Sequence, residues 1–217
     1  MTGHLEAERA AILAAALTHA PLDGWTSSLL GPAAAEAGFD ETMVRRAFPG
    51  GVNEIIDAFV ADADARMVAA LDGRDLSEMR IRDRIALAVR LRLEGNLQYR
   101  EAIRRALAVH WRLSHGPAAL RGVYQTVDAI WRALGDTSTD FNFFTKRGLL
   151  AGVYGTTLLY WLDDSSEDFA DTWAFLDRRI EDIMRIQKAR GHLDKLGERL
   201  VSLGRLRSRS PLARARR

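Results

Sequence analysis

The residue types best able to carry chemistry are spaced in ways that exclude the common catalytic sites. The five histidines show no i,i+4 pair with a helical carboxylate, and Glu-x-x-His occurs nowhere, which argues against a zinc protease or a di-iron bundle. The chain has no cysteine, no Gly-x-Ser-x-Gly elbow, no Walker loop and no Rossmann glycine pattern. We therefore expect no catalytic residue, no bound metal, no cofactor and no enzymatic activity.

Three glycines form the first candidate binding feature. Gly148, Gly152 and Gly155 lie at i, i+4 and i+7 on an almost wholly apolar segment. Glycine costs a helix about 1 kcal/mol per position, so the stripe needs a reason. One reason is close helix–helix approach, for example across a dimer interface. The alternative is a smooth channel for a linear apolar ligand, with Tyr154, Leu158 and Trp161 as walls; Tyr124 and Trp131, on a neighbouring apolar stripe, join this candidate lipid-binding set.

The C-terminal tail is the second candidate. Residues 185–217 hold eleven Lys or Arg against two acids, a local charge of +9, although the whole chain carries only +2. A leucine stripe runs through the tail, flanked by cations, and could be a docked helix with a solvated face. Each cation near an anionic surface adds about 1 kcal/mol, so we favour a membrane-surface helix. The predicted membrane contacts are Leu193, Leu196, Leu200, Leu203, Lys195, Arg199, Arg205 and Arg207.

Composition places these features on a soluble globular protein. Hydrophobic residues make up 47% and charged residues 28% of the 217. The opening residues show no secretory signal or transit peptide, and no apolar run approaches the roughly 20 residues of a membrane span. The expected location is cytoplasmic, peripherally associated with the inner (cytoplasmic) membrane.

Helical periodicity runs through the whole chain, with Gly and Pro between the periodic segments. The predicted helices cover about 5–20, 26–37, 40–47, a stretch after 51, 78–94, 97–114, 117–134, 140–162 and 167–188. Asp40 and Gly135 are expected to cap helix ends. The sequence therefore predicts an all-α fold, with the candidate residues on its second half and tail.

The segment "GWTSSLLGPAAAEAGFDETMVRRAFPGGVNEII" resembles the N-terminal domain of TetR-type regulators. Gly38 would supply the turn between the two central helices, and Phe48 would fill the small core. Residues 1–66 carry four Arg, no Lys and ten acids. Because duplex affinity comes chiefly from neutralising phosphates, we interpret this region as a retained scaffold for which DNA is an improbable partner.

The segment "GDTSTDFNFFTKRGLLAGVYGTTLLYWLDDSSEDFADTWAFLDRRIEDIM" resembles the signature region of the Coq-nine family, accessory proteins of ubiquinone biosynthesis. The matching pieces are Trp131 before Gly-Asp, "STDFN", an aromatic pair followed by Thr and two basic residues, "TT", "DSS" and "DTW-FL--R". "GWT" at 24–26 matches the start of the same family. The resemblance covers nearly the whole chain.

The resemblance implies a TetR-like fold, a homodimer, a lipid held in the helical ligand domain, and an amphipathic C-terminal helix on the membrane. It also implies a partner, the di-iron hydroxylase that acts on demethoxyubiquinone. The partner-binding residues carry over to Asp140, Phe143, Phe144, Asp128 and Ile130. The family often has Trp-Tyr where this chain has Phe143-Phe144, so hydrogen bonds from those rings are missing. Of the neighbouring rings, Phe141 is expected in the core and Phe143 exposed, with Phe144 at the edge of the surface.

These observations predict a lipid-binding accessory protein that holds a polyprenyl quinone intermediate at the membrane and presents it to a partner hydroxylase. The predicted divisions are a helix-turn-helix-like subdomain over 1–66, a lipid-binding helical domain with dimer helices over 67–188, and a basic amphipathic tail over 189–217. The alternative is a TetR-type, ligand-responsive transcriptional repressor. A generic lipid carrier is a third possibility.

Overall fold

The computed structural model describes residues 5–110, 116–137 and 141–185. Every regular element in these three ranges is helical, as the sequence predicts. The α-helices are α1 (Glu6–Asp23), α2 (Leu30–Glu36), α3 (Glu41–Ala47), α4 (Val52–Asp72), α5 (Ile81–Glu94), α6 (Arg100–His110), α7 (Gly116–Ala133) and α8 (Phe141–Asp163). Short 3-10 turns occur at Ser27–Leu29, Leu97–Tyr99 and Glu167–Phe169, and residues 170–185 are helical.

Local signals at helix ends account for several of these boundaries. The Asp40 side chain accepts a hydrogen bond from the Met43 backbone N–H at 2.8 Å and so caps α3. Gly38 and Gly135 have φ angles of +77° and +79°, which a glycine adopts without the strain of a Cβ. Gly38 turns the chain between α2 and α3, and Gly135 ends α7. The capping predictions for Asp40 and Gly135 are confirmed.

Several boundaries differ from the prediction: the helix predicted from 78 begins at Ile81, and those predicted from 97 and 167 begin as 3-10 turns. Two further differences lie in the N-terminal helices. α1 continues past Pro21 to Asp23, because a proline in the last turn loses only one backbone donor, and the Gly24 N–H still donates to the Ala20 carbonyl at 3.0 Å. The predicted helix 26–37 begins as a 3-10 turn, and the Thr26 side chain makes no capping hydrogen bond. Its hydroxyl lies 2.6 Å from that of Ser28 instead.

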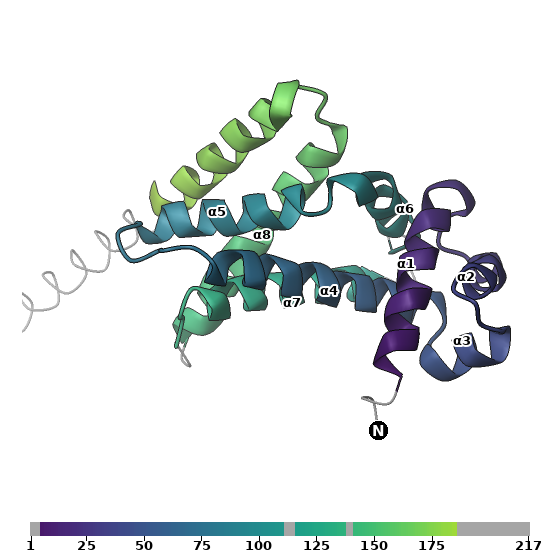
Figure 1. Ribbon diagram of the computed structural model, residues 1–217. Helices are drawn as coiled ribbons and strands as arrows, with labels where there is room; N and C mark the ends of the chain where they lie inside the picture. The colour runs from purple at the N-terminus through teal and green to yellow at the C-terminus, as the bar shows by residue number, and fades with distance from the viewer. Residues whose placement is uncertain (1–4, 111–115, 138–140, 186–217) are drawn as a thin grey trace, which may run out of the picture. The chain divides into compact units, whose positions relative to one another are not determined.

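Helices α1, α2 and α3 pack against one another and against the start of α4, drawn in purple and blue in Figure 1. Their shared core is wholly apolar and contains Ile12, Leu29, Val44, Phe48 and Ile55, all almost fully buried. Phe48 thus occupies the core position that the sequence predicts. On the surface of α3, Arg45 pairs with Glu41 of the same helix at 3.0 Å.

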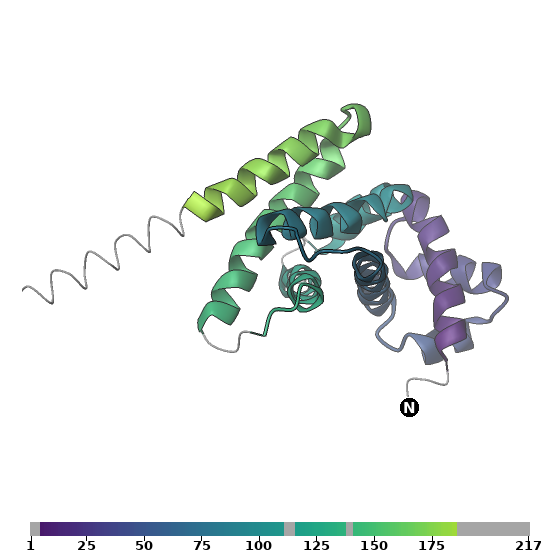
Figure 2. The ribbon, with the colours of Figure 1, turned by 60° about the vertical axis from the view of Figure 1, so that its left-hand side comes forward.

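Helices α4 to α8 pack around a second core; Figure 2 views α4 and α7 nearly end-on. Helix α4 packs on α5 and α7, α7 packs on α8, and α6 contacts α7 and α8. α6 also contacts α1, and the buried indole N–H of Trp25 donates to the Ala102 carbonyl at 2.8 Å. Helix α4 therefore belongs to both cores.

Residues up to Leu176 form one compact unit, and the residues from Asp177 onward belong to a second unit. Of that second unit, 177–185 are described; they are helical and carry ion pairs such as Arg179 with Asp182 at 2.8 Å. The predicted boundary at 66/67 falls inside α4. The three-part domain division remains a prediction, and its tail, 189–217, lies outside the described residues.

Candidate ligand cavity and partner surface

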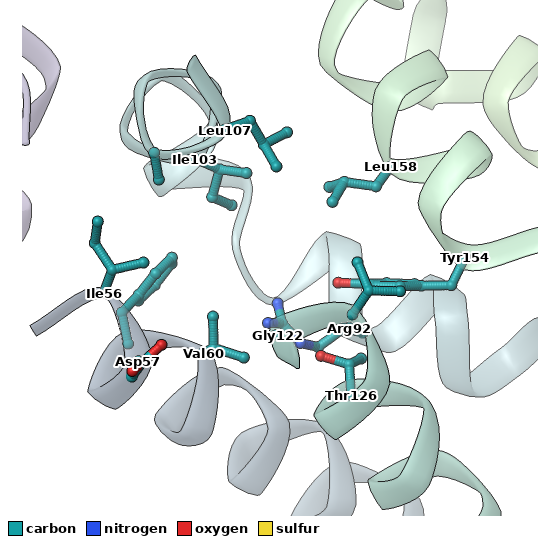
Figure 3. A pocket seen from close by; sticks show the side chains of 13 residues that line it. Ile56, Asp57, Val60, Arg92, Ile103, Leu107, Gly122, Thr126, Tyr154 and Leu158 are labelled. Atoms are coloured by element: carbon teal, nitrogen blue, oxygen red, sulfur yellow. The ribbon is translucent and has the colours of Figure 1, made fainter. Parts of the chain in front are cut away.

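A cavity of about 80 Å³ lies between α4, α6, α7 and α8 and reaches a side chain of α5 (Figure 3). Most of its wall is aliphatic or aromatic, which follows from the apolar faces that these helices turn inward. The apolar lining includes Ile56, Phe59, Val60, Ile103, Leu107 and Leu158. Such a wall suits the hydrocarbon part of a ligand.

One end of the cavity is polar. Arg92 of α5, Thr126 of α7 and Tyr154 of α8 all line it, and Figure 3 shows both hydroxyls turned toward the guanidinium. Arg92 Nε donates to Asp64 Oδ1 of α4 at 2.7 Å, and Thr126 Oγ1 donates to the same oxygen at 2.9 Å. Arg92 and Asp64 are only 4% and 6% exposed. Four helices thus bring together a buried ion pair and two hydroxyls.

Burial governs the protonation of these groups. It raises the pKa of Asp64, although the charge of Arg92 and its hydrogen bond act in the opposite direction. Burial also acts to lower the pKa of Arg92, but Tyr154 and Asp64 outweigh it, so the net shift is upward. Burial raises the pKa of Tyr154 as well. Arg92 therefore stays a cation and Tyr154 a neutral hydroxyl at physiological pH.

A second buried arginine ties the end of α7 to the start of α8. Arg147 is 2% exposed; its Nε lies 2.7 Å from Asp128 Oδ1 and its Nη1 lies 3.1 Å from Asp136 Oδ2. Lys146 also pairs with Asp136, at 2.7 Å, and Arg132 with Asp128, at 2.8 Å. Both carboxylates therefore have two cations each.

This ion-pair cluster supports an aromatic surface at the start of α8. The Arg147 guanidinium carbon lies 3.5 Å from the centre of the Phe143 ring, and the Phe143 and Phe144 rings meet edge to face at 5.2 Å. Phe144 is 67% exposed, whereas Phe143 is half-buried. The expectation that Phe143 is the exposed ring, with Phe144 beside it, is wrong. Phe144 is the ring presented to solvent, because stacking on Arg147 draws Phe143 inward.

Comparison of the chain with known proteins identifies its family. A family model described as COQ9 matches residues 116–187. The chain is 36% identical over 197 residues to "Ubiquinone biosynthesis protein COQ9, mitochondrial" of Rattus norvegicus, covering 88% of this chain and 63% of that protein. The corresponding protein of Homo sapiens is 34% identical, with 88% and 62% covered. COQ9-B of Xenopus laevis is 30% identical over 201 residues, with 88% and 67% covered.

The chain belongs to the COQ9 family. It spans a little under two thirds of the length of the rat and human relatives. A solved structure of a TetR transcriptional regulator from Nitrosomonas europaea matches with a TM-score of 0.66 and 23% identity, covering 80% of this chain and 96% of that one. The Coq-nine resemblance and the TetR-like all-α fold are thus confirmed.

The predicted lipid-binding residues of this COQ9-family chain separate in space. Tyr154 and Leu158 line the cavity. Trp161 and Trp131 are buried but are not among its lining residues, and Tyr124 is 43% exposed. The glycine stripe does not line it either: a Cβ at Gly148, Gly152 or Gly155 would meet nothing within 4 Å. The stripe faces an open side of α8.

Sequence reasoning missed the polar end of the cavity and the contribution of α4. Asp64 follows Ile56 and Val60 at four-residue steps. An acid on this otherwise apolar face of α4 indicates a buried polar group. Arg92 gave no comparable signal, because α5 carries several arginines and the sequence does not distinguish the buried one.

Of the predicted partner-binding residues, Phe144 is exposed and Phe143 and Asp128 are half-buried. Ile130 is fully buried, which conflicts with a surface role. Asp140 and the side chain of Phe141 lie outside the described part of the chain, as does the whole predicted membrane-binding tail. Within the described ranges, no helix is both long and apolar enough to span a bilayer, and no cluster of acids and histidines could hold a metal ion.

Proposed function

We propose that this COQ9-family protein is an accessory factor of ubiquinone biosynthesis that binds the polyprenyl part of a quinone intermediate. It presents the intermediate to a partner hydroxylase, the enzyme that acts on demethoxyubiquinone, and does no chemistry itself. The observation that carries the proposal is the largely apolar cavity between α4, α6, α7 and α8. The relatives' names, which specify ubiquinone biosynthesis, support the choice of ligand.

Two further parts of the proposal concern surfaces. The exposed Phe144 ring, held beside Phe143 and the Arg147 cluster, is the proposed docking point for the hydroxylase. The basic tail, with its leucine stripe, is the proposed membrane contact, and it would place a homodimer at the lipid surface where a polyprenyl quinone resides.

The decisive experiment is solvent extraction of the protein purified from a ubiquinone-producing host, followed by mass spectrometry. Isoprenoid quinones are expected in the extract. Ala106 lines the cavity, so Ala106→Phe is expected to reduce the bound quinone, whereas Gly148→Ala on the open face of α8 is expected to leave it unchanged. An extract without isoprenoids, or one holding only phospholipid, would contradict the proposal.

A chain lacking residues 191–217 tests the membrane contact. It is expected to stop floating with anionic vesicles while keeping its quinone.

A further inference from the structure

The polar groups at the Arg92 end of the cavity are satisfied by one another. Arg92 Nε and Thr126 Oγ1 both donate to Asp64, and the Tyr154 hydroxyl is hydrogen-bonded to Thr126. In the described part of the chain, none of these four residues has a buried polar atom without a partner. Polar recognition of a ligand is therefore left to the rest of the cavity lining.

The one other polar side chain among the described lining residues is Asp57 of α4. It is half-buried, and within the described ranges its carboxylate has neither a hydrogen bond nor an ion pair. Asp57 precedes Asp64 by seven residues, so the two acids lie on the same side of α4, about 10 Å apart along the helix axis. Figure 3 shows Asp57 and Arg92 at separate ends of the lining, with Val60 between them in this view.

The chemistry of a carboxylate decides which ligand group suits this position. An ionised Asp57 accepts hydrogen bonds and donates none, so the ligand must supply an O–H or N–H donor. An anionic head group would be repelled, because no described cation pairs with Asp57 to balance a second negative charge. The carbonyl oxygens of a quinone ring only accept hydrogen bonds, whereas the hydroxyl of a phenol or a quinol donates one.

We propose that Asp57 is the polar subsite of the cavity and accepts a hydrogen bond from a phenolic hydroxyl of the ligand, whose hydrocarbon chain lies against the apolar wall that includes Val60, Ile103 and Leu158. The subsite rests on the proposed function, since it assigns the form of the ring that the same cavity holds. It makes the protein selective for a phenol or quinol over the oxidised quinone, and for either over a lipid with an anionic head group.

The test compares three probes by equilibrium dialysis against the full chain. They carry the same short prenyl chain on a phenol, on the methyl ether of that phenol, and on a benzoquinone. The wild-type chain is expected to bind the phenol about fivefold more tightly than the other two, because only the phenol offers Asp57 a donor. Equal affinity for the phenol and the quinone would overturn the subsite and leave the proposed function standing.

Two variants assign the preference to the carboxylate. Asp57→Leu removes the acceptor and is expected to bind all three probes with equal affinity, whereas Asp57→Asn keeps an acceptor oxygen and should retain part of the preference. Asp72→Leu, which removes an exposed acid of α4 outside the cavity lining, is the matched control and should keep the full preference.

The remaining outcomes separate the subsite from the proposed function. A preference for the phenol that survived in Asp57→Leu would overturn the subsite. A prenyl amine bound more tightly than the phenol, with the excess lost in Asp57→Leu, would overturn the assignment of a phenol in favour of a cationic head group. If none of the prenyl probes binds the wild-type chain, the proposed function fails together with the subsite.

Discussion

Two arginines in this protein are equally buried but differently paired. Arg147 lies between two carboxylates, each of which also contacts a second cation. Arg92 has a single carboxylate, Asp64, and its remaining donors line a cavity. The first arrangement braces α7 against α8, whereas the second joins α4 to α5 beside the cavity. The difference shows that two equally buried arginines can be paired very differently within the same chain.

Removing Arg92 is expected to have the largest effect on stability. Arg92→Met leaves Asp64 buried with no cation, which costs about 3–5 kcal/mol of unfolding free energy. Burial already raises the pKa of Asp64. A raised pKa in the folded state means that the folded protein is favoured at low pH, where the buried acid is protonated. The unfolding free energy lost in Arg92→Met should therefore be greater at pH 8 than at pH 5. Urea denaturation at both pH values measures it.

The double variant Asp64→Leu with Arg92→Met is the control for that loss. Apolar residues of similar size often replace a buried ion pair without loss, so the double variant should recover most of the stability of the wild-type chain. A double variant no more stable than Arg92→Met alone would show that the pair itself, rather than the orphaned charge, holds the four helices together.

Removing Arg147 is expected to cost less, although its side chain is just as buried. Lys146 still pairs with Asp136 and Arg132 with Asp128, so Arg147→Met should lose about 1.5–3 kcal/mol, the range for hydrogen bonds to charged groups. The Arg132 side chain is 75% exposed and shares Asp128, so Arg132→Met should lose less than about 1 kcal/mol. A loss from Arg147→Met that exceeded that from Arg92→Met would reverse the comparison. The same urea titrations measure the unfolding free energy of all three variants.

The comparison also shows what the sequence could and could not predict. Asp40, Gly38 and Gly135 act within a few residues of themselves, so local rules place them correctly. The bond between Arg92 and Asp64 joins residues 28 positions apart, and no local pattern indicates which arginine of α5 turns inward. Helical spacing separates the two aromatic rings by about 100° but does not say which ring faces solvent. That choice depends on where Arg147 packs.

The glycine stripe of α8 also shows how far the sequence predicts the site. Its spacing correctly places Gly148 and Gly152 on one side of α8, and the structure finds both exposed. The cavity nevertheless lies on an adjacent face of α8, at Tyr154 and Leu158, and the sequence does not show which of the two apolar faces lines it. The sequence therefore identifies the helix that carries the site but only part of the site.

The smallest expected effect on stability is at Phe144, above the Arg147 cluster. Because its ring is 67% exposed, Phe144→Lys should change the unfolding free energy by less than about 0.5 kcal/mol. It is nevertheless expected to abolish co-purification with the hydroxylase, since a lysine cannot replace an aromatic anchor. Leu159→Lys, at another exposed apolar position of α8, is the control and should retain the partner. Retained binding by the Phe144 variant would move the docking surface elsewhere.

Helix α4 has a thermodynamic consequence of its own. It contributes Ile55 to the apolar core of α1–α3 and Asp64 to the ion pair beside the cavity. Unfolding of α4 would therefore remove buried contacts from both cores at once. Both cores should therefore melt in a single cooperative transition. A ligand bound only to the folded cavity would then also protect the N-terminal helices, whose backbone amides would exchange more slowly although they touch no ligand.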